Sequence, residues 1–112
     1  MVLAEKIVTA MERGTANTRW RDFVDITRLS ELVPIDSSEL RRAIEMVANH
    51  RAVQIRPLAE TLDGYPQIAQ TKWAAWRRKQ QLTQTTPEQF AHLIAIVCLL
   101  SDPLLQPDEG DP

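Results

Sequence analysis

Apolar residues at helical spacing run through nearly the whole chain and leave almost no material for a sheet. Only Ala52–Ile55 has the character of a β-strand, and four residues cannot form a sheet alone. The rest of the 112 residues divides at prolines, glycines and polar turns into segments with one apolar stripe. We therefore predict an all-α fold, an irregular bundle of five to six helices with no sheet.

Start and stop signals give the expected bounds of these helices. Gly14 is suited to the left-handed conformation that ends a helix, and Pro34 stops the next one. Asn17 or Thr18 can cap the second helix by accepting from its free amides. The expected helical segments cover residues 3–13, 18–33, 36–50, 57–62, 66–81 and 87–100.

Two of these helices have marked starts. Asp36 and Glu39 have the spacing of a capping box at the third helix. Thr86 and Pro87 combine a cap with a proline at the first helical position, which predicts a strong start for the last helix. That helix ends with apolar residues nearly all round, so we expect it to be central; these residues are Ile96, Leu99 and Leu100.

One domain is expected over residues 1–103, followed by a flexible acidic tail over 104–112. The net charge of −2 arises from acids near the C-terminus and is too small to indicate nucleic-acid binding by bulk charge. Cys98 is the only cysteine, so we expect no internal disulfide and read it as a small buried residue. The sequence shows no membrane span and no leader, which predicts a cytoplasmic protein.

The first helix begins without a cap. Val2 and Leu3 already lie on its apolar stripe, and nothing before them can satisfy its free amides. We interpret this segment as the later part of a longer helix, with further sequence expected upstream. The alternative is a genuine N-terminus that frays.

A charged constellation surrounds the first helical hairpin. If the turn centres near Ala16, Lys6 and Asp25 lie level in an antiparallel pair, and Asp22 lies one turn away. An ammonium, a carboxylate and a helix N-terminus can together handle a nucleoside triphosphate. The alternative is an ordinary surface ion pair between neighbouring helices, worth ~0–1 kcal/mol.

The residues around this constellation resemble two motifs of the AbiEii nucleotidyltransferase toxins. These are the toxin halves of bacterial type IV toxin–antitoxin pairs, which include abortive-infection and mycobacterial systems. Leu3-Ala4-Glu5-Lys6 resembles the pattern L-x-E-K, and Arg19–Ile26 resembles R-x-K-D-x-x-D-L. Further similar stretches lie at residues 56–58, 64–65 and 69–77, so the resemblance extends to about Pro103.

The resemblance implies the helical C-terminal part of a nucleotidyltransferase fold, in which an N-terminal sheet carries a Gly-Ser motif and a metal-binding acidic pair. Such toxins transfer a nucleotide from a nucleoside triphosphate with Mg²⁺, and tRNA is an acceptor in some. By this resemblance, Lys6 contacts the triphosphate and Asp22 is the catalytic carboxylate. Arg19 and Arg21 are phosphate-binding candidates, although Arg21 stands where lysine is usual. Asp25 matches the second aspartate, in a structural role.

The chain departs from the family pattern in one respect. It has no D-x-D, no glycine-rich loop and no strand to carry either. Phosphoryl transfer depends on metal-assisted charge neutralisation. We therefore expect a truncated or fragmentary toxin that binds no cofactor by itself and is inactive alone. An antitoxin is an expected partner, and nucleotide and tRNA are expected only if the missing half is supplied.

An alternative function class stays open: a non-catalytic helical interaction module that binds an antitoxin or acts as a decoy. A second open alternative concerns the aromatic and basic stretch near residue 76. Arg77, Arg78 and Lys79 can contact RNA beside an exposed aromatic ring, or Trp73 and Trp76 pack inward while the basic residues stay in water. Neither histidine has further ligands at metal-binding spacing, so we predict no metal site.

Overall fold

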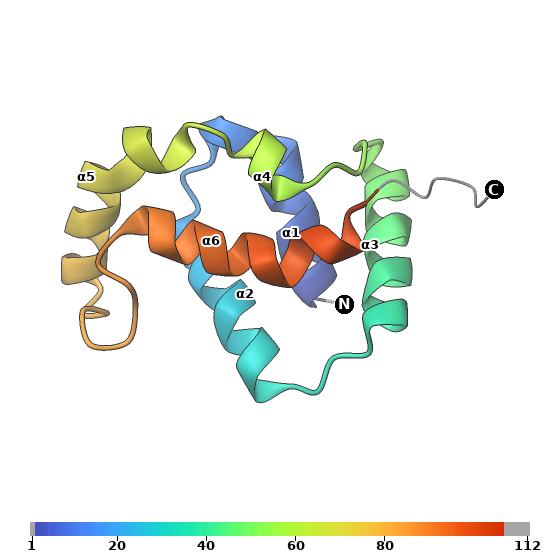
Figure 1. Cartoon of the computed structure of the whole chain (residues 1–112), viewed down its shortest axis with the longest axis horizontal. Helices are drawn as coiled ribbons and strands as arrows, with labels where there is room; N and C mark the ends of the chain where they lie inside the picture. The colour runs from blue at the N-terminus through green and yellow to red at the C-terminus, as the bar shows by residue number, and fades with distance from the viewer. Residues whose placement is uncertain (1, 107–112) are drawn as a thin grey trace.

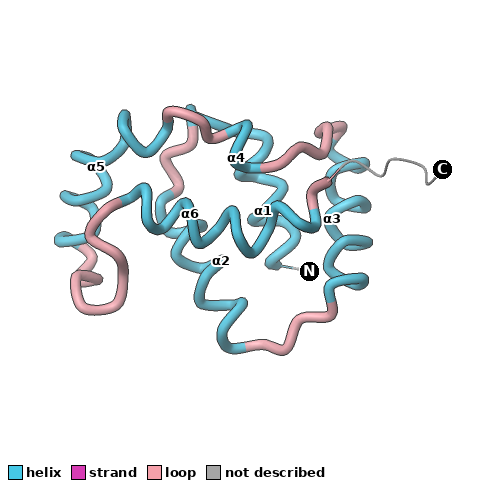
Figure 2. The backbone as a smooth tube through the Cα atoms, in the orientation of Figure 1, coloured by secondary structure: helices cyan, strands magenta, loops and turns pink. Residues whose placement is uncertain are grey.

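The computed structural model describes residues 2–106, and within that range it contains helices and loops but no strand (Figure 1, Figure 2). The predicted all-α fold is therefore confirmed. Two short 3₁₀ turns, η1 (Gly14–Ala16) and η2 (Asp102–Leu104), follow the first and last helices. The α-helices of the described range are α1 (Val2–Arg13), α2 (Trp20–Leu32), α3 (Ser37–Arg51), α4 (Leu58–Thr61), α5 (Tyr65–Lys79) and α6 (Phe90–Ser101).

Two helices, α1 and α6, share the centre of the packing. α6 packs against α2, α4 and α5, and it crosses the middle of the molecule between α5 at one end and α3 at the other (Figure 1). α1 contacts α2, α3 and α4. Its buried residues are Leu3, Ala4, Ile7, Val8, Thr9, Ala10 and Met11. The central place predicted for the last helix is therefore confirmed, although α1 shares it.

Aromatic rings join α2, α5 and α6. The ring of Phe90 lies between 5.2 and 5.8 Å, centroid to centroid, from those of Trp20, Phe23, Tyr65 and Trp73. Most of these contacts are edge-on or tilted, which are favourable arrangements for aromatic rings. This cluster fixes α5 against the first turns of α2.

The third helix starts as predicted. The carboxylate of Asp36 accepts a hydrogen bond from the amide of Glu39 at 3.1 Å. The helix ends at a left-handed Ala52 (φ 56°), and the residues after it are loop. Gly14 also adopts the left-handed conformation predicted for it, with φ +53°.

The predicted start of the last helix is wrong, because α6 begins at Phe90 and not at Pro87. The guanidinium of Arg77 bonds both the hydroxyl and the carbonyl of Thr86, the expected cap. The amide of Phe90 instead donates to Oε1 of Gln70 at 2.6 Å. A side chain from α5 thus caps α6, and the polar segment before it stays a loop.

The packed part of the chain extends past the predicted boundary at Pro103. Leu105 is fully buried, and the backbone carbonyls of Leu104 and Gln106 accept from Arg41. Residues 104–106 therefore pack against the domain beyond the proline that follows α6. The rest of the predicted acidic tail, residues 107–112, lies outside the described residues.

The end of α6 is more exposed than its composition predicts. Leu99 is 79% exposed and Leu100 is 40% exposed. Together with Leu32 and Val33 at the end of α2, they line a groove of about 680 Å³. The apolar run therefore forms part of an open surface instead of a fully enclosed core. None of the helices within residues 2–106 is long and apolar enough to cross a membrane.

Candidate functional site

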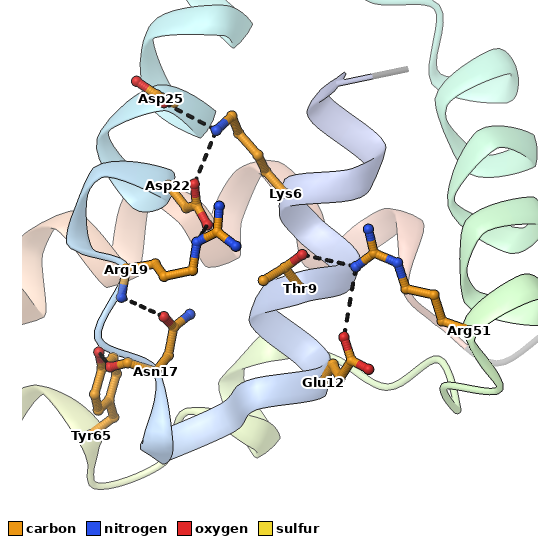
Figure 3. Close-up of polar contacts among 9 residues, drawn as sticks. All are labelled: Lys6, Thr9, Glu12, Asn17, Arg19, Asp22, Asp25, Arg51 and Tyr65. Carbon is orange, nitrogen blue, oxygen red and sulfur yellow. Dashed lines mark hydrogen bonds and ion pairs between the residues drawn. The ribbon is translucent and has the colours of Figure 1, made fainter.

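The α1–α2 hairpin brings the predicted phosphate-site residues together from neighbouring helices (Figure 3). Nζ of Lys6 lies 3.0 Å from Oδ1 of Asp22 and 3.1 Å from Oδ2 of Asp25. Antiparallel helices joined by a short turn place residues equally far from the turn at the same level. The spacing argument therefore predicted this contact correctly, and the ammonium bridges both carboxylates.

Asp22 is the buried member of this ion-pair cluster, which comprises Lys6, Arg19, Asp22 and Asp25. Its side chain is 6% exposed, compared with 20% for Lys6 and 27% for Asp25. The second oxygen of Asp22 lies 3.0 Å from Nε of Arg19. Burial of a carboxylate is costly unless cations and donors compensate for lost water. Lys6 supplies a charge and a hydrogen bond to Oδ1, whereas Arg19 supplies a charge beside Oδ2, which accepts no hydrogen bond within the described residues.

Lys6 stays a cation across the physiological pH range. Partial burial alone would lower the pKa of its ammonium, but the hydrogen bonds and charges of Asp22 and Asp25 outweigh burial and raise that pKa above 10.5. A protonated lysine neutralises phosphate but cannot accept a proton. The arrangement therefore fits electrostatic binding by Lys6 and leaves base chemistry to a carboxylate.

The turn before α2 is fixed by buried groups, not by the predicted cap. α2 begins at Trp20, and no side chain in the described part of the chain caps it. Asn17, which is 1% exposed, accepts instead from the amide of Arg19 at 2.7 Å. The hydroxyl of Tyr65 donates to the carbonyl of Asn17 (Figure 3). These bonds fix the backbone from which Arg19 extends toward Asp22.

The opposite face of α1 is attached to α3. Nη1 of Arg51 donates to the hydroxyl of Thr9 at 2.9 Å and lies 3.7 Å from the carboxylate of Glu12 (Figure 3). α1 is thus held on both sides, by α3 through Arg51 and by α2 through Lys6. This attachment sets the rotation of α1 and therefore the direction in which Lys6 points.

A pocket of about 380 Å³ opens beside the ion-pair cluster. It is smaller than the groove at the end of α2, but it contains the charged groups of the cluster. Sequence reasoning did not assign Trp76 or Gln80 to this site, because no local signal shows that α5 packs beside the start of α2. The residues that line the pocket are Lys6, Thr18, Arg19, Trp20, Arg21, Asp22, Asp25, Trp76 and Gln80.

The model of a known family matches most of the chain. It describes the nucleotidyl transferase AbiEii toxin of type IV toxin–antitoxin systems, and it matches residues 1–95. The chain belongs to the AbiEii toxin family. The resemblance drawn from the residues is therefore confirmed, and the family implies an antitoxin partner. Comparison with curated proteins gave no match, and comparison with solved structures gave none either.

The carboxylates of this AbiEii chain do not fit the Mg²⁺ that the family implies. Mg²⁺ requires near-octahedral oxygen ligands, whereas Asp22 is engaged by two cations and Asp25 by one. A divalent ion between these carboxylates would meet the ammonium of Lys6. Within residues 2–106, no three His, Cys, Asp or Glu side chains gather as a metal site. We therefore derive no metal-dependent step from the ion-pair cluster.

The aromatic and basic stretch of the AbiEii chain divides between core and surface. Trp73 is fully buried, whereas Trp76 is only partly buried. The guanidinium of Arg77 donates to three acceptors in the loop that follows α5, so its role is to hold that loop. Arg78 and Lys79 are exposed. Of the two tryptophans that the sequence allowed to pack inward, Trp73 does so completely and Trp76 only in part.

Proposed function

We propose that the α1–α2 hairpin is the helical half of a nucleotide-transfer site, in which Lys6 contacts the triphosphate and Asp22 is the catalytic carboxylate. The observation that carries this proposal is the Lys6 ammonium, placed between two carboxylates at the edge of an open pocket. Within the ion-pair cluster two cations balance two carboxylates, so Arg21 gives the pocket a net positive charge. The start of α2 borders the same pocket, and helix N-termini favour phosphate.

The chemistry follows from competition for Lys6. Phosphate oxygens and the carboxylate of Asp22 are alternative partners for one ammonium, so an incoming triphosphate frees Oδ1 of Asp22. That oxygen then accepts the proton of an acceptor hydroxyl while the hydroxyl oxygen bonds to the α-phosphorus and pyrophosphate leaves. Asp25 keeps its bond to Lys6 and positions it.

The Lys6 contact is tested by calorimetric titration of the chain with a nucleoside triphosphate. Lys6→Ala is expected to weaken binding about tenfold, since a hydrogen bond to a charged group contributes about 1.5–3 kcal/mol. Lys72→Ala is the matched control, because Lys72 is exposed on α5 and does not line the pocket. Equal affinity of the Lys6 variant and the control would contradict the proposal and favour the non-catalytic interaction module.

We further propose that this helical unit does not complete the transfer alone. It offers one lysine and one candidate catalytic carboxylate, whereas phosphoryl transfer also needs metal-assisted charge neutralisation. Incubation with labelled nucleoside triphosphate, Mg²⁺ and tRNA is expected to give no labelled RNA. Labelling that disappears in Lys6→Ala would show that the unit is an enzyme by itself.

For the acceptor we propose tRNA, in the cytoplasm, with Arg78 and Lys79 contacting its phosphates. Both side chains are exposed on the last turn of α5. Each phosphate contact adds about one unit to the salt dependence of binding. The double variant Arg78→Ala with Lys79→Ala should lower the salt slope by about two in a filter-binding assay. An unchanged slope would rule these residues out.

A further inference from the structure

The pocket beside the ion-pair cluster has an aromatic wall to which the transfer chemistry assigns no role. Trp76, in the last turns of α5, and Gln80, the residue that follows this helix, line the same pocket as Lys6 and Asp22. They belong to a different segment from the charged residues and lie more than fifty positions further along the sequence. The pocket therefore combines the proposed phosphate-binding residues with an aromatic ring. A nucleotide carries the two groups that these would bind, phosphates and a planar base.

Trp76 is held rigidly. Its ring stacks on that of Trp73, with centroids 5.7 Å apart and an interplanar angle of 27°. Trp73 is fully buried, packs against Phe90 and donates its indole N–H to the carbonyl of Pro87 at 3.3 Å. The buried, hydrogen-bonded Trp73 therefore supports one side of Trp76, while part of the Trp76 surface stays accessible.

An exposed arginine lies over the Trp76 ring. The guanidinium carbon of Arg21 lies 5.6 Å from the centroid of the Trp76 ring, and Nη2 of Arg21 donates to Oε1 of Gln80 at 3.3 Å. Arg21 is exposed, and an exposed cation–π contact is weaker than the stacking of a base on an aromatic ring. A planar base can therefore replace the planar guanidinium.

We propose that Trp76 is the stacking platform for a nucleobase, that Gln80 contacts the edge of that base, and that the displaced Arg21 moves onto the adjoining phosphate. The inference rests on the proposed function, because it places the base beside the phosphates that Lys6 contacts. The base belongs either to the free nucleotide or to the unpaired end of an RNA acceptor. Since every base has a π-face, the platform tolerates different bases.

Calorimetric titration of the full chain with four probes tests this assignment. The probes are ATP, adenosine, inorganic tripolyphosphate and a short single-stranded RNA. Trp76→Leu should weaken ATP and adenosine about tenfold and leave tripolyphosphate unchanged, because only stacking is lost. Arg21→Ala should weaken tripolyphosphate but not adenosine, since it removes a cation and uncovers the ring. Trp76→Phe keeps a ring and should restore most of the affinity for the base.

The source of the base is read from the same data. A loss confined to the RNA probe assigns the platform to the acceptor end, whereas a loss with ATP and adenosine assigns it to the nucleotide. Gln67→Ala, which alters an exposed residue of the same helix outside the pocket, is the control for indirect effects. If Trp76→Leu, shown to be folded by circular dichroism, binds both ATP and RNA like the parent chain, the platform assignment is wrong.

Failure of this inference is distinct from failure of the proposed function. Lys6→Ala should weaken tripolyphosphate and ATP and leave adenosine unchanged. If only Lys6→Ala weakens binding, the phosphate site is supported and the assignment of the base platform is wrong. If only the Trp76 effect is seen, the base platform stands without the proposed phosphate contact.

Discussion

Lys6 joins two helices through a single ammonium, and its two partners are not equivalent. Asp22 is almost completely buried, so its carboxylate depends on Lys6 and Arg19 for the interactions that water would supply. Asp25 is 27% exposed and retains water as a partner. At the scale of single residues, removal of the lysine and removal of the outer aspartate should therefore have different consequences for stability.

Lys6→Ala should lower the free energy of unfolding by about 1–3 kcal/mol, because a buried carboxylate loses a charged hydrogen bond. Asp25→Asn should cost less than about 1 kcal/mol, as partly exposed ion pairs usually do. Urea denaturation followed by circular dichroism measures both. Equal losses for the two variants would show that burial of Asp22 does not govern the energetics of the cluster.

Gly14 is a second residue whose effect on stability can be tested. Its φ of +53° disfavours any residue with a Cβ atom, and an added Cβ would lie 3.3 Å from the carbonyl oxygen of Thr61. Gly14→Ala is therefore expected to destabilise the fold by about 1–2 kcal/mol. Gly64→Ala is the matched control, with φ +79° and open space around the added atom. Gly64→Ala should lose only the stability that the left-handed backbone costs a residue with a Cβ atom. A larger loss of stability in Gly64→Ala than in Gly14→Ala would contradict a role for the close approach to Thr61.

At the scale of elements, α6 shows how a tertiary contact can override a local signal. Thr86 and Pro87 form a strong sequence signal for a helix start, yet Arg77 engages Thr86 and keeps the segment as a loop. The helix starts three residues later, where Gln70 of α5 accepts from the amide of Phe90. A long-range cap of this kind leaves no trace in the spacing of neighbouring residues.

Gln70→Ala is expected to destabilise the protein by about 1 kcal/mol, the usual cost of losing a helix cap. Gln67→Ala is the control, because Gln67 is exposed on the same helix and is subject to the same change in helix propensity. Thermal unfolding of both variants gives the comparison. If the two melt at the same temperature, the side chain of Gln70 does not stabilise the start of α6.

What the sequence could predict about these elements depends on distance along the chain. The Asp36 cap and the level placement of Lys6 and Asp25 follow from local spacing and a short turn, and both are present. The aromatic wall at Trp76 and the packing of Leu105 were missed. They depend on which distant helices meet, and an apolar stripe predicts that a face is buried without naming its partner.

At the scale of the whole molecule, three side chains make stability depend on alkaline pH in the same direction: Tyr65, Lys6 and Cys98, whose thiol has its pKa raised by burial from 9.0 to about 11. Burial raises the pKa of Tyr65 well above its ordinary value of 10, so the unfolded chain loses this proton first. The pKa of Lys6 is raised as well: burial alone would lower it, but its bonds to Asp22 and Asp25 prevail. The stability from Lys6 is complete below pH 10.5 and is lost as the pH rises through its folded pKa.

The free energy of unfolding should therefore fall as the pH rises above 9.0, the ordinary pKa of the Cys98 thiol, and more steeply above about 10. Urea titrations at a series of pH values between neutrality and strong alkali measure this fall. Tyr65→Phe removes the phenolic contribution, so the variant should lose stability less steeply with pH than the parent chain. Parallel curves for the two proteins would exclude Tyr65 as a source of the alkaline sensitivity.

The attachment of Asp102 to α4 has a consequence for how the protein is made. Its carboxylate accepts hydrogen bonds from the amides of Leu58, at 2.7 Å, and Ala59, at 3.2 Å, although 44 residues separate Asp102 from the first of them. During translation these amides leave the ribosome long before their partner. A nascent chain whose synthesis stalls before Asp102 therefore presents an open turn to cellular proteases, and completion of synthesis protects that turn.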